Sequence, residues 1–300
     1  MRGKKVSIFT GNHLTTGISD QLDYLIFILN KYGIEATTST RLSNDVPNIL
    51  IENFTNYEVF LIEKFKNENK NAELFCIVTE HFELKDGNLF LNEERFDSAR
   101  TYIPNLYERF INFFRLSHYF SGIITLQGLP KKDYIQEIFL QHKIFNFSGL
   151  PLPSDIKNRS RDKIEYEYDL CFFGKLTEHR QSILDKLKRK YRIYVGYEVA
   201  PKARNRVLMK TRYNINIAQS ENWTNVSTMR VFSSSKLGVS TINLSKLSDN
   251  NVPGLINMRL EDLMENGLPS SRKTTKLKTI KNSRKIVNNF CLDGFELWID

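Results

Sequence analysis

The hydrophobic residues of this chain occur either in short continuous runs or in longer stretches where they recur every three or four positions. Continuous runs such as Leu74–Val78 and Gly122–Leu126 are typical of strands buried on both faces of a parallel sheet. The recurring pattern, as at Leu22, Leu25 and Leu29, predicts amphipathic helices. Because the two patterns alternate, the chain is expected to form parallel sheets with right-handed helical crossovers.

The same patterns give the order of elements, with Ser19 predicted to cap the first helix. In the first half, the expected strands are 6–9, 35–40, 48–51, 74–78, 122–126 and 144–147, and the expected helices are 19–33, 57–65, 104–119 and 132–143. In the second half, the expected strands are 168–173, 192–195, 213–218 and 239–244, and the expected helices are 178–190, 201–211 and 228–237. An Asp-Gly turn at 86–87 marks a polar insertion between a strand and a helix of the first half.

One segment interrupts every periodic pattern and separates the two halves. It reads GLPLPS over residues 149–154 and is followed by a burst of charge at 157–163. Prolines and charges of this kind mark domain boundaries. We therefore expect a first domain at 1–153, a second at 154–267, and a basic tail with a terminal helix at 268–300.

Charge divides the chain in the same way. Residues 1–150 carry 16 Lys/Arg and 18 Asp/Glu, a balance of −2, whereas residues 151–300 carry 27 and 16, a balance of +11. A strongly basic half indicates an anionic partner. A nucleotide diphosphate, a nucleic acid and an anionic membrane all fit this charge.

Other features narrow the class of protein. The three cysteines have no metal-ligand spacing and are expected to be reduced thiols in a cytoplasmic protein. The apolar run after the cationic start is too short for a signal peptide, and no stretch approaches the ~20 apolar residues of a membrane span. A Walker phosphate loop and a Gly-x-Ser-x-Gly elbow are both missing.

The most informative segment, residues 168–180, reads YDLCFFGKLTEHR. An apolar strand stops at Gly174 and passes into a helix start that carries Lys175, His179 and Arg180. Glycine allows the sharp turn and leaves space beside the backbone. A helix N-terminus with cations after a parallel strand is where α/β proteins hold phosphates, although an ordinary basic surface turn has the same pattern.

A second segment repeats this logic. The strand at 213–218, rich in Asn and Ile, leads into a polar loop that contains Glu221. The helix that follows begins near Thr228 and carries Arg230 in its first turn. Free backbone N–H groups and the helix dipole favour an anion there, and an arginine can bind a phosphate or carboxylate through two hydrogen bonds. A capped helix with a surface arginine is the alternative interpretation.

Taken together, the motifs Gly-x-Leu-x-x-x-Arg and Arg-Val-Phe-x-x-x-x-x-Gly-x-x-x-Ile over residues 168–244 resemble the C-terminal half of GT-B glycosyltransferases. The resemblance is closest to the bacterial group-1-like enzymes that modify cell-surface or protein acceptors. It implies a GT-B-like α/β fold, in which two Rossmann-like domains with parallel sheets face a central cleft. It also implies that Gly174 faces the donor diphosphate, that Arg180 and Arg230 neutralise it, and that the helix from Thr228 lies against the nucleotide or sugar.

The chain departs from this family at one position. Relatives usually carry an acidic residue directly after the Phe of the Arg-x-Phe helix, where this chain has Ser233. Glu221, in the preceding loop, is the candidate to supply a carboxylate to a ribose or sugar hydroxyl. The expected donor site comprises Gly174, Lys175, His179, Arg180, Glu221, Thr228 and Arg230.

Transfer of a sugar also needs either a base for the acceptor hydroxyl or a front-face mechanism without one. Open α/β sheets keep their sites at the carboxyl ends of strands, which selects His13, Glu80 and His81 as catalytic candidates and Glu52 as a weaker one. The resemblance implies a nucleotide-sugar co-substrate and no metal, which agrees with the lack of a clustered Asp-x-Asp pair. The expected function is therefore metal-independent transfer of a hexose-like sugar to a glycan, protein or DNA acceptor by a bacterial or phage enzyme.

Two other functions fit the sequence. The basic half would serve a nucleic-acid-binding protein, including a phage enzyme that glucosylates DNA bases, and Ser233 leaves open a non-catalytic GT-B-shaped partner subunit. The segment 268–285 carries seven Lys/Arg and no acidic residue. It fits peripheral contact with nucleic acid or with the anionic inner face of a membrane, and it fits a solvated linker equally well.

Overall fold

The structure is a computed structural model of the 300-residue chain. It describes residues 4–11, 15–52, 54–80, 82–91, 94–126, 132–147, 165–197, 199–221, 226, 228–245, 255–269, 292 and 295. Two compact units are present: Met1–Thr15, Gln21–Gly149 and Phe290–Asp300 form unit 1, and Thr16–Asp20 and Leu150–Asn289 form unit 2. The expected boundary at 153/154 and most of the basic segment 268–285 lie outside the described residues.

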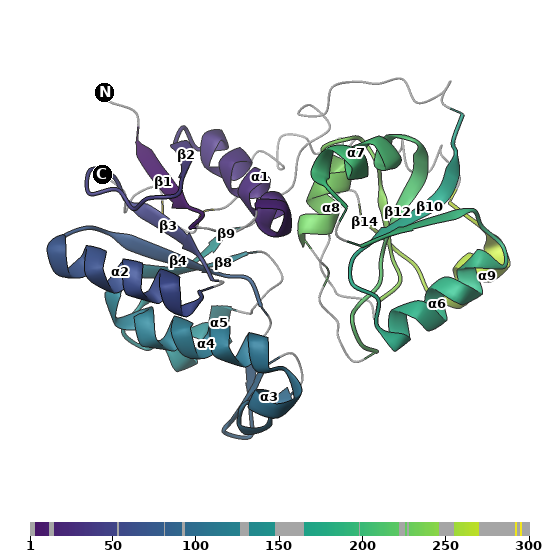
Figure 1. Cartoon of the computed structure of the whole chain (residues 1–300). Helices are drawn as coiled ribbons and strands as arrows, with labels where there is room; N and C mark the ends of the chain where they lie inside the picture. Colours follow the sequence, from purple (N-terminus) through teal and green to yellow (C-terminus); the bar gives the residue numbers. More distant parts are fainter. Residues whose placement is uncertain are drawn as a thin grey trace. The chain divides into compact units, whose positions relative to one another are not determined.

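The centre of unit 1 is a six-stranded sheet in which every neighbouring pair is parallel (Figure 1). Its spatial order is β2-β1-β3-β4-β8-β9. The strands are β1 (Lys5–Phe9), β2 (Glu35–Ser39), β3 (Asn48–Ile51), β4 (Leu74–Val78), β8 (Gly122–Leu126) and β9 (Lys143–Phe147). From β1 to β2 the strand order advances toward one edge of the sheet, and from β3 onward it advances toward the other edge. The topological switch point of this doubly wound sheet therefore lies between β1 and β3.

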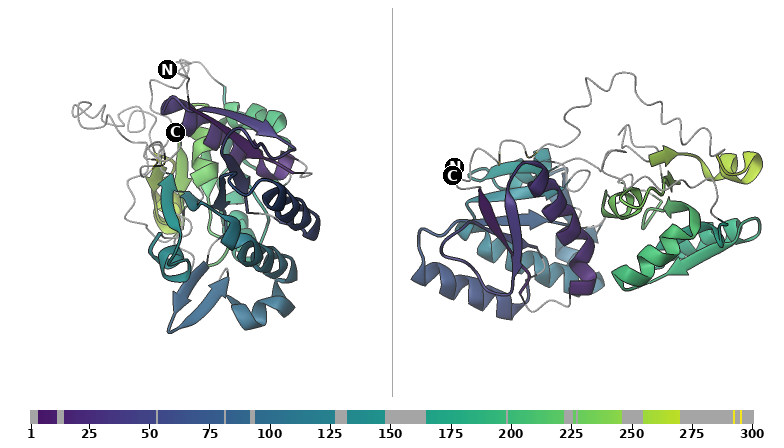
Figure 2. Two further views of the ribbon diagram at one scale, coloured as in Figure 1. Left: turned by 90° about the vertical axis from the view of Figure 1, so that its left-hand side faces the viewer. Right: turned by 90° about the horizontal axis from the view of Figure 1, so that it is seen from above.

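Helices cover both faces of this sheet (Figure 2). They are α1 (Thr15–Lys31) on one face and α2 (Asn56–Glu68), α4 (Pro104–Leu116) and α5 (Lys132–Ile138) on the other. Alternate residues of β4 face opposite ways, and Leu74, Cys76 and Val78 pack in one buried cluster with Ile62 of α2 and Phe110 of α4. A strand buried on both faces is uniformly apolar, which is why β4 and β8 are visible in the sequence as continuous runs.

A small antiparallel sheet lies between β4 and α4 in the sequence. It consists of β5 (Phe82–Lys85), β6 (Asn88–Leu91) and β7 (Glu94–Arg95), and it is followed by α3 (Phe96–Tyr102). Asp86 and Gly87 have φ angles of 51° and 73°, the left-handed conformation that the β5–β6 turn requires. The turn was predicted from the sequence, whereas these three strands and α3 were not. The predicted helix 104–119 is α4 followed by a 3₁₀ turn, Ser117–Tyr119.

The end of the chain belongs to unit 1. Phe295 is fully buried, and its ring makes edge-on contacts with Phe75, Phe145 and Phe147 at centroid distances of 4.9, 5.2 and 5.1 Å. These three residues lie on β4 and β9. Phe295 thus completes the core of the first unit, although the chain from Leu150 to Asn289 belongs to the second.

Unit 2 is built around a five-stranded parallel sheet of order β11-β10-β12-β13-β14. The strands are β10 (Tyr168–Phe173), β11 (Ile193–Gly196), β12 (Thr211–Asn216), β13 (Thr241–Asn243) and β14 (Leu255–Asn257). The helices α6 (Glu178–Lys188) and α9 (Leu260–Asn266) share a buried cluster on one face, and α7 (Pro201–Met209) and α8 (Thr228–Ser235) lie on the other (Figure 1).

The predicted fold class, two Rossmann-like α/β domains with parallel sheets, is confirmed by this topology. The element prediction was wrong in several details. The helix α1 begins at Thr15, so Ser19 lies within it, α5 ends at Ile138 instead of 143, and β14 and α9 were not predicted. Within the described part of the chain, no helix combines the length and apolar character needed to span a membrane.

Candidate functional site

The site in unit 2 begins where β10 ends. Gly174 has a φ angle of 150°, a conformation that residues with a side chain rarely adopt. A Cβ atom placed there would lie 2.9 Å from Nη2 of Arg230 and 3.8 Å from Nη1 of Arg180. Glycine is therefore needed both for the turn and for the approach of two guanidinium groups to the backbone.

Arg180 enters the site from the first turn of α6. Thr177 caps this helix by accepting a hydrogen bond from the Arg180 backbone N–H at 3.3 Å. The Arg180 side chain is buried, and its Nε donates to the carbonyl oxygens of Ile217 at 3.0 Å and Ala218 at 3.2 Å. Its Nη1 donates to the carbonyl oxygen of Lys175 at 2.8 Å. The guanidinium thus joins the turn after β10 to the segment after β12.

Arg230 enters from the first turn of α8, on the opposite face of the sheet. Its Nε donates to the carbonyl oxygen of Phe173 at 3.1 Å, and its Nη1 donates to Oδ1 of Asn216 at 2.6 Å. Both arginines lie over the ring of Phe172, with Cζ-to-centroid distances of 5.4 Å for Arg180 and 5.1 Å for Arg230. The carboxyl end of β10 therefore gathers two cations from helices on opposite faces of one sheet.

The electrostatics of this pair favour an anion. Burial lowers the pKa of Arg180 to about 10. Burial and then the charge of Arg180 lower the pKa of Arg230 to about 9, and the negative charge of Asp20 partly opposes this shift. Both groups remain charged at neutral pH. In the described part of the chain, every atom that accepts a hydrogen bond from them is a neutral oxygen. A bound phosphate would compensate both charges.

The other expected donor-site residues take different positions. Lys175 is exposed beside Gly174, and His179 is half-buried one residue before Arg180. Glu221 is exposed in the loop after β12. Thr228 is the first residue of α8, and its side chain lies outside the description. The structure therefore brings Gly174, Lys175, Arg180 and Arg230 together. Phe172 and Asn216 were not predicted from the sequence. The signal for Asn216 was an asparagine within an apolar strand, and Phe172 had none.

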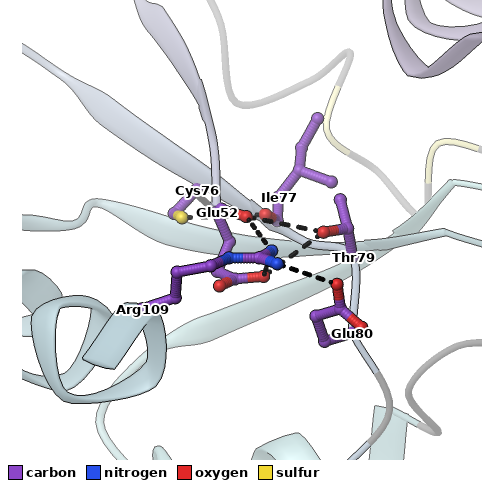
Figure 3. Close-up of polar contacts among 6 residues, drawn as sticks. All are labelled: Glu52, Cys76, Ile77, Thr79, Glu80 and Arg109. Atoms are coloured by element: carbon purple, nitrogen blue, oxygen red, sulfur yellow. Dashed lines mark hydrogen bonds and ion pairs between the residues drawn. The ribbon is translucent and has the colours of Figure 1, made fainter. Parts of the chain in front are cut away.

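A second polar cluster lies in unit 1, at the carboxyl ends of β3 and β4 (Figure 3). Glu52 follows β3 directly and is fully buried. Its Oε2 accepts hydrogen bonds from Nη2 of Arg109 at 3.1 Å and from the Thr79 hydroxyl at 3.2 Å. Nη1 of Arg109 donates to Oε1 of Glu80 at 3.0 Å. Arg109, on α4, therefore joins two carboxylates that come from neighbouring strands.

Of the expected catalytic residues, Glu80 is the one that the structure describes, because His13 and His81 lie outside the described residues. Glu52, the weaker candidate, is the partner of Glu80 through Arg109, and Arg109 was missed by sequence reasoning. Among described residues, Oε1 of Glu52 and Nε of Arg109 are buried without a hydrogen-bond partner. Buried polar atoms of this kind are uncommon and often mark functional clusters. In the same residues, no group of three or more His, Cys, Asp or Glu is arranged to hold a metal ion.

Glu52 gives the protein a pH-dependent stability. Burial raises its pKa from 4.5 to about 7, and the charge of Arg109 opposes this shift. A carboxyl whose pKa is higher in the folded chain contributes stability that is full below about pH 4.5 and is lost as pH rises through about 7. From pH 4.5 to pH 7, the free energy of unfolding of the wild type should therefore fall relative to that of Glu52→Gln, by on the order of 1–3 kcal/mol.

Urea unfolding of both proteins across this pH range measures the difference. Glu63→Gln is the matched control, because it removes another arginine-paired carboxylate, the partner of Arg115 in the same unit. A difference between wild type and Glu52→Gln that stays constant with pH would contradict the assignment.

Comparison with known proteins gives similarities of structure alone. No family model matches the chain, and a search of curated proteins found no match. T4 phage β-glucosyltransferase is similar over 99% of both chains, with 12% identity and a TM-score of 0.49. AviGT4, a glycosyltransferase involved in avilamycin A biosynthesis, is similar over 90% of both chains, with 11% identity and a TM-score of 0.45.

An α-glucosyltransferase that was solved in complex with UDP and a 13-mer DNA is also similar. The similarity covers 97% of this chain and 93% of that one, with 8% identity and a TM-score of 0.49. These three solved structures are glycosyltransferases.

Proposed function

We propose that this protein is a hexosyltransferase-like glycosyltransferase that takes a sugar from a nucleotide-sugar donor. The observation that supports this most directly is the pair Arg180 and Arg230, two charged guanidinium groups held beside Gly174 by neutral oxygen atoms. A diphosphate carries enough negative charge to compensate both. The donor diphosphate would therefore bind at the carboxyl end of β10.

The same geometry suits departure of the diphosphate during transfer. Negative charge grows on the leaving oxygen as the bond to the sugar breaks, and cations that are already fixed stabilise it without reorganisation. Arg180 is fixed by three backbone carbonyl groups, and Arg230 by one carbonyl and one side-chain amide. Both arginines also lie in the first turn of a helix, where the dipole favours an anion. These groups supply the charge that other transferases take from a metal, so the proposed reaction is metal-independent.

The acceptor hydroxyl would lose its proton to a group of unit 1, with His13, Glu80 and His81 as the candidates. Glu80 lies two residues after β4, where an open parallel sheet places its functional groups, and Arg109 fixes its carboxylate. The acceptor is a glycan, a protein or a DNA base. DNA agrees best with the +11 balance of residues 151–300, because a basic surface attracts an anionic polymer.

The experiment that tests the donor proposal is a thermal titration of the purified protein with UDP, GDP, CMP and dTDP and with their sugar conjugates, in the presence of EDTA. A ligand at about 100 times its Kd stabilises the folded state by about 2.7 kcal/mol, which raises the melting temperature by several degrees. We expect one diphosphate family to do so, with the nucleoside alone giving no shift. If no nucleotide raises the melting temperature, the donor site is not where we place it.

A further inference from the structure

Three asparagine side chains form a row that starts at Arg230 and crosses the sheet of unit 2. Asn216, Asn243 and Asn257 are direct partners in the register of β12, β13 and β14. Nδ2 of Asn216 donates to Oδ1 of Asn243 at 2.9 Å, and Nδ2 of Asn243 donates to Oδ1 of Asn257 at 2.9 Å. The first two side chains are buried, and the third is exposed.

The orientation of every amide in this row is set by the arginine. A guanidinium has donors and no acceptor, so the atom of Asn216 that lies 2.6 Å from Nη1 of Arg230 must be its oxygen. Its nitrogen must then face Asn243, whose oxygen accepts and whose nitrogen in turn donates to Asn257. Each amide therefore has one state that satisfies both neighbours, and Arg230 is tied through the row to three adjacent strands.

The partner of Arg230 in this row is a neutral amide, Asn216, whereas other arginines of the chain pair with carboxylates. Arg109 pairs with Glu52 and Glu80, and Arg115 pairs with Glu63. A carboxylate at position 216 would also accept from Arg230, but it would place a negative charge against the guanidinium and cancel its attraction for an anion. An amide holds the same hydrogen bond and leaves the charge available.

We infer that Asn216, supported by Asn243 and Asn257, is a positioning residue that fixes Arg230 for a diphosphate without itself neutralising the arginine charge. This inference rests on the proposed function, because it takes the diphosphate site between Arg180 and Arg230 as given. The new element is that the uncharged side chain of Asn216 determines whether the site binds a diphosphate.

The test is calorimetric titration of inorganic pyrophosphate into the wild type, Asn216→Asp and Asn216→Ser. Asn216→Asp should lower the affinity roughly tenfold or more, because the new carboxylate opposes the anion. Asn216→Ser keeps a neutral oxygen and should lose less affinity than Asn216→Asp. Asn266→Asp, an exposed position at the end of α9 in the same unit, adds the same charge away from the site and should leave the affinity unchanged.

The outcomes separate the two proposals. Wild-type binding of pyrophosphate with equal binding by Asn216→Asp overturns the inference and leaves the proposed function standing. Absence of pyrophosphate and nucleotide binding in the wild type overturns both. A merely structural role of Asn216 would lower the melting temperature of Asn216→Asp without a selective loss of pyrophosphate affinity, and that result also overturns the inference.

A second measurement decides the matter if Asn216→Asp does not fold. The Nε–H signal of Arg230, followed by NMR with ¹⁵N-labelled arginine, reports how firmly its guanidinium is held. In Asn216→Ser the shorter side chain should let this proton exchange faster with solvent than in the wild type, while the Arg180 signal stays as it is. Equal exchange of the Arg230 proton in the two proteins overturns the inference.

Discussion

Replacing Arg230 with alanine should lower both nucleotide-diphosphate affinity and the rate of sugar transfer, the latter by on the order of 10²-fold or more. The guanidinium is one of the two arginine cations at the end of β10, and it is fixed in place before the ligand arrives. Its loss removes charge stabilisation from the bound donor and more of it from the departing diphosphate. Calorimetry measures the first effect, and release of nucleotide from the sugar donor measures the second.

The fold should tolerate this change. Arg230 is half-buried and its pKa is lowered by burial and by the charge of Arg180, so the folded chain holds two like charges in proximity. Removing one of them relieves this repulsion and offsets the lost hydrogen bonds. Arg192→Ala is the matched control, because Arg192 is an exposed arginine of the same unit that pairs with Asp169. Unchanged nucleotide affinity in Arg230→Ala would remove the main support for the site.

The glycine and the two arginines of the proposed donor site could be predicted from the sequence because their signals are local. Gly174 and Arg180 lie within one strand–turn–helix unit, and the apolar run of β10 marks the strand by itself. Arg230 was found because it follows a predicted helix start. In each case the backbone conformation that matters is determined by residues a few positions away, which is the range over which strand and helix patterns carry information.

The partners of these arginines could not be found in this way. Asn216 lies 14 residues from Arg230, and Arg109 lies 57 residues from Glu52. Each contact exists because parallel strands bring their carboxyl ends to one edge, and the sequence predicts that edge without predicting which side chains meet there. An asparagine in an apolar strand and an arginine in an aromatic helix were visible, but neither has a partner within its own element.

The strands of the insertion between β4 and α4 were missed for a different reason. Its strands β5, β6 and β7 are short and carry charged residues such as Glu83 and Lys85, so they show neither a continuous apolar run nor a full alternation. The Asp86-Gly87 turn was the only strong signal. Residues held mainly by pairing with one neighbour leave a weaker pattern than residues buried in a core.

Replacing Gly174 with alanine should disable the donor site by a different route from Arg230→Ala. The φ angle of 150° disfavours any side chain, at a cost of about 1–3 kcal/mol. The new Cβ would lie 2.9 Å from Nη2 of Arg230, closer than real Cβ contacts, and the flexible end of the arginine would move away. Nucleotide-diphosphate affinity should therefore fall by roughly tenfold or more, because the guanidinium leaves the position that Asn216 and Phe173 give it.

Gly267→Ala separates the two consequences of this substitution. Gly267 lies in the same unit and also has a positive φ angle, 78°, but a Cβ there would meet no atom within 4 Å. The variant Gly267→Ala should have a lower melting temperature because of backbone strain, and its nucleotide affinity should be unchanged. Gly174→Ala should lower both quantities. Equal nucleotide affinity in Gly174→Ala and Gly267→Ala would show that the close approach of Arg230 to the backbone is dispensable. A selective loss in Gly174→Ala would show that this glycine serves the ligand as well as the turn.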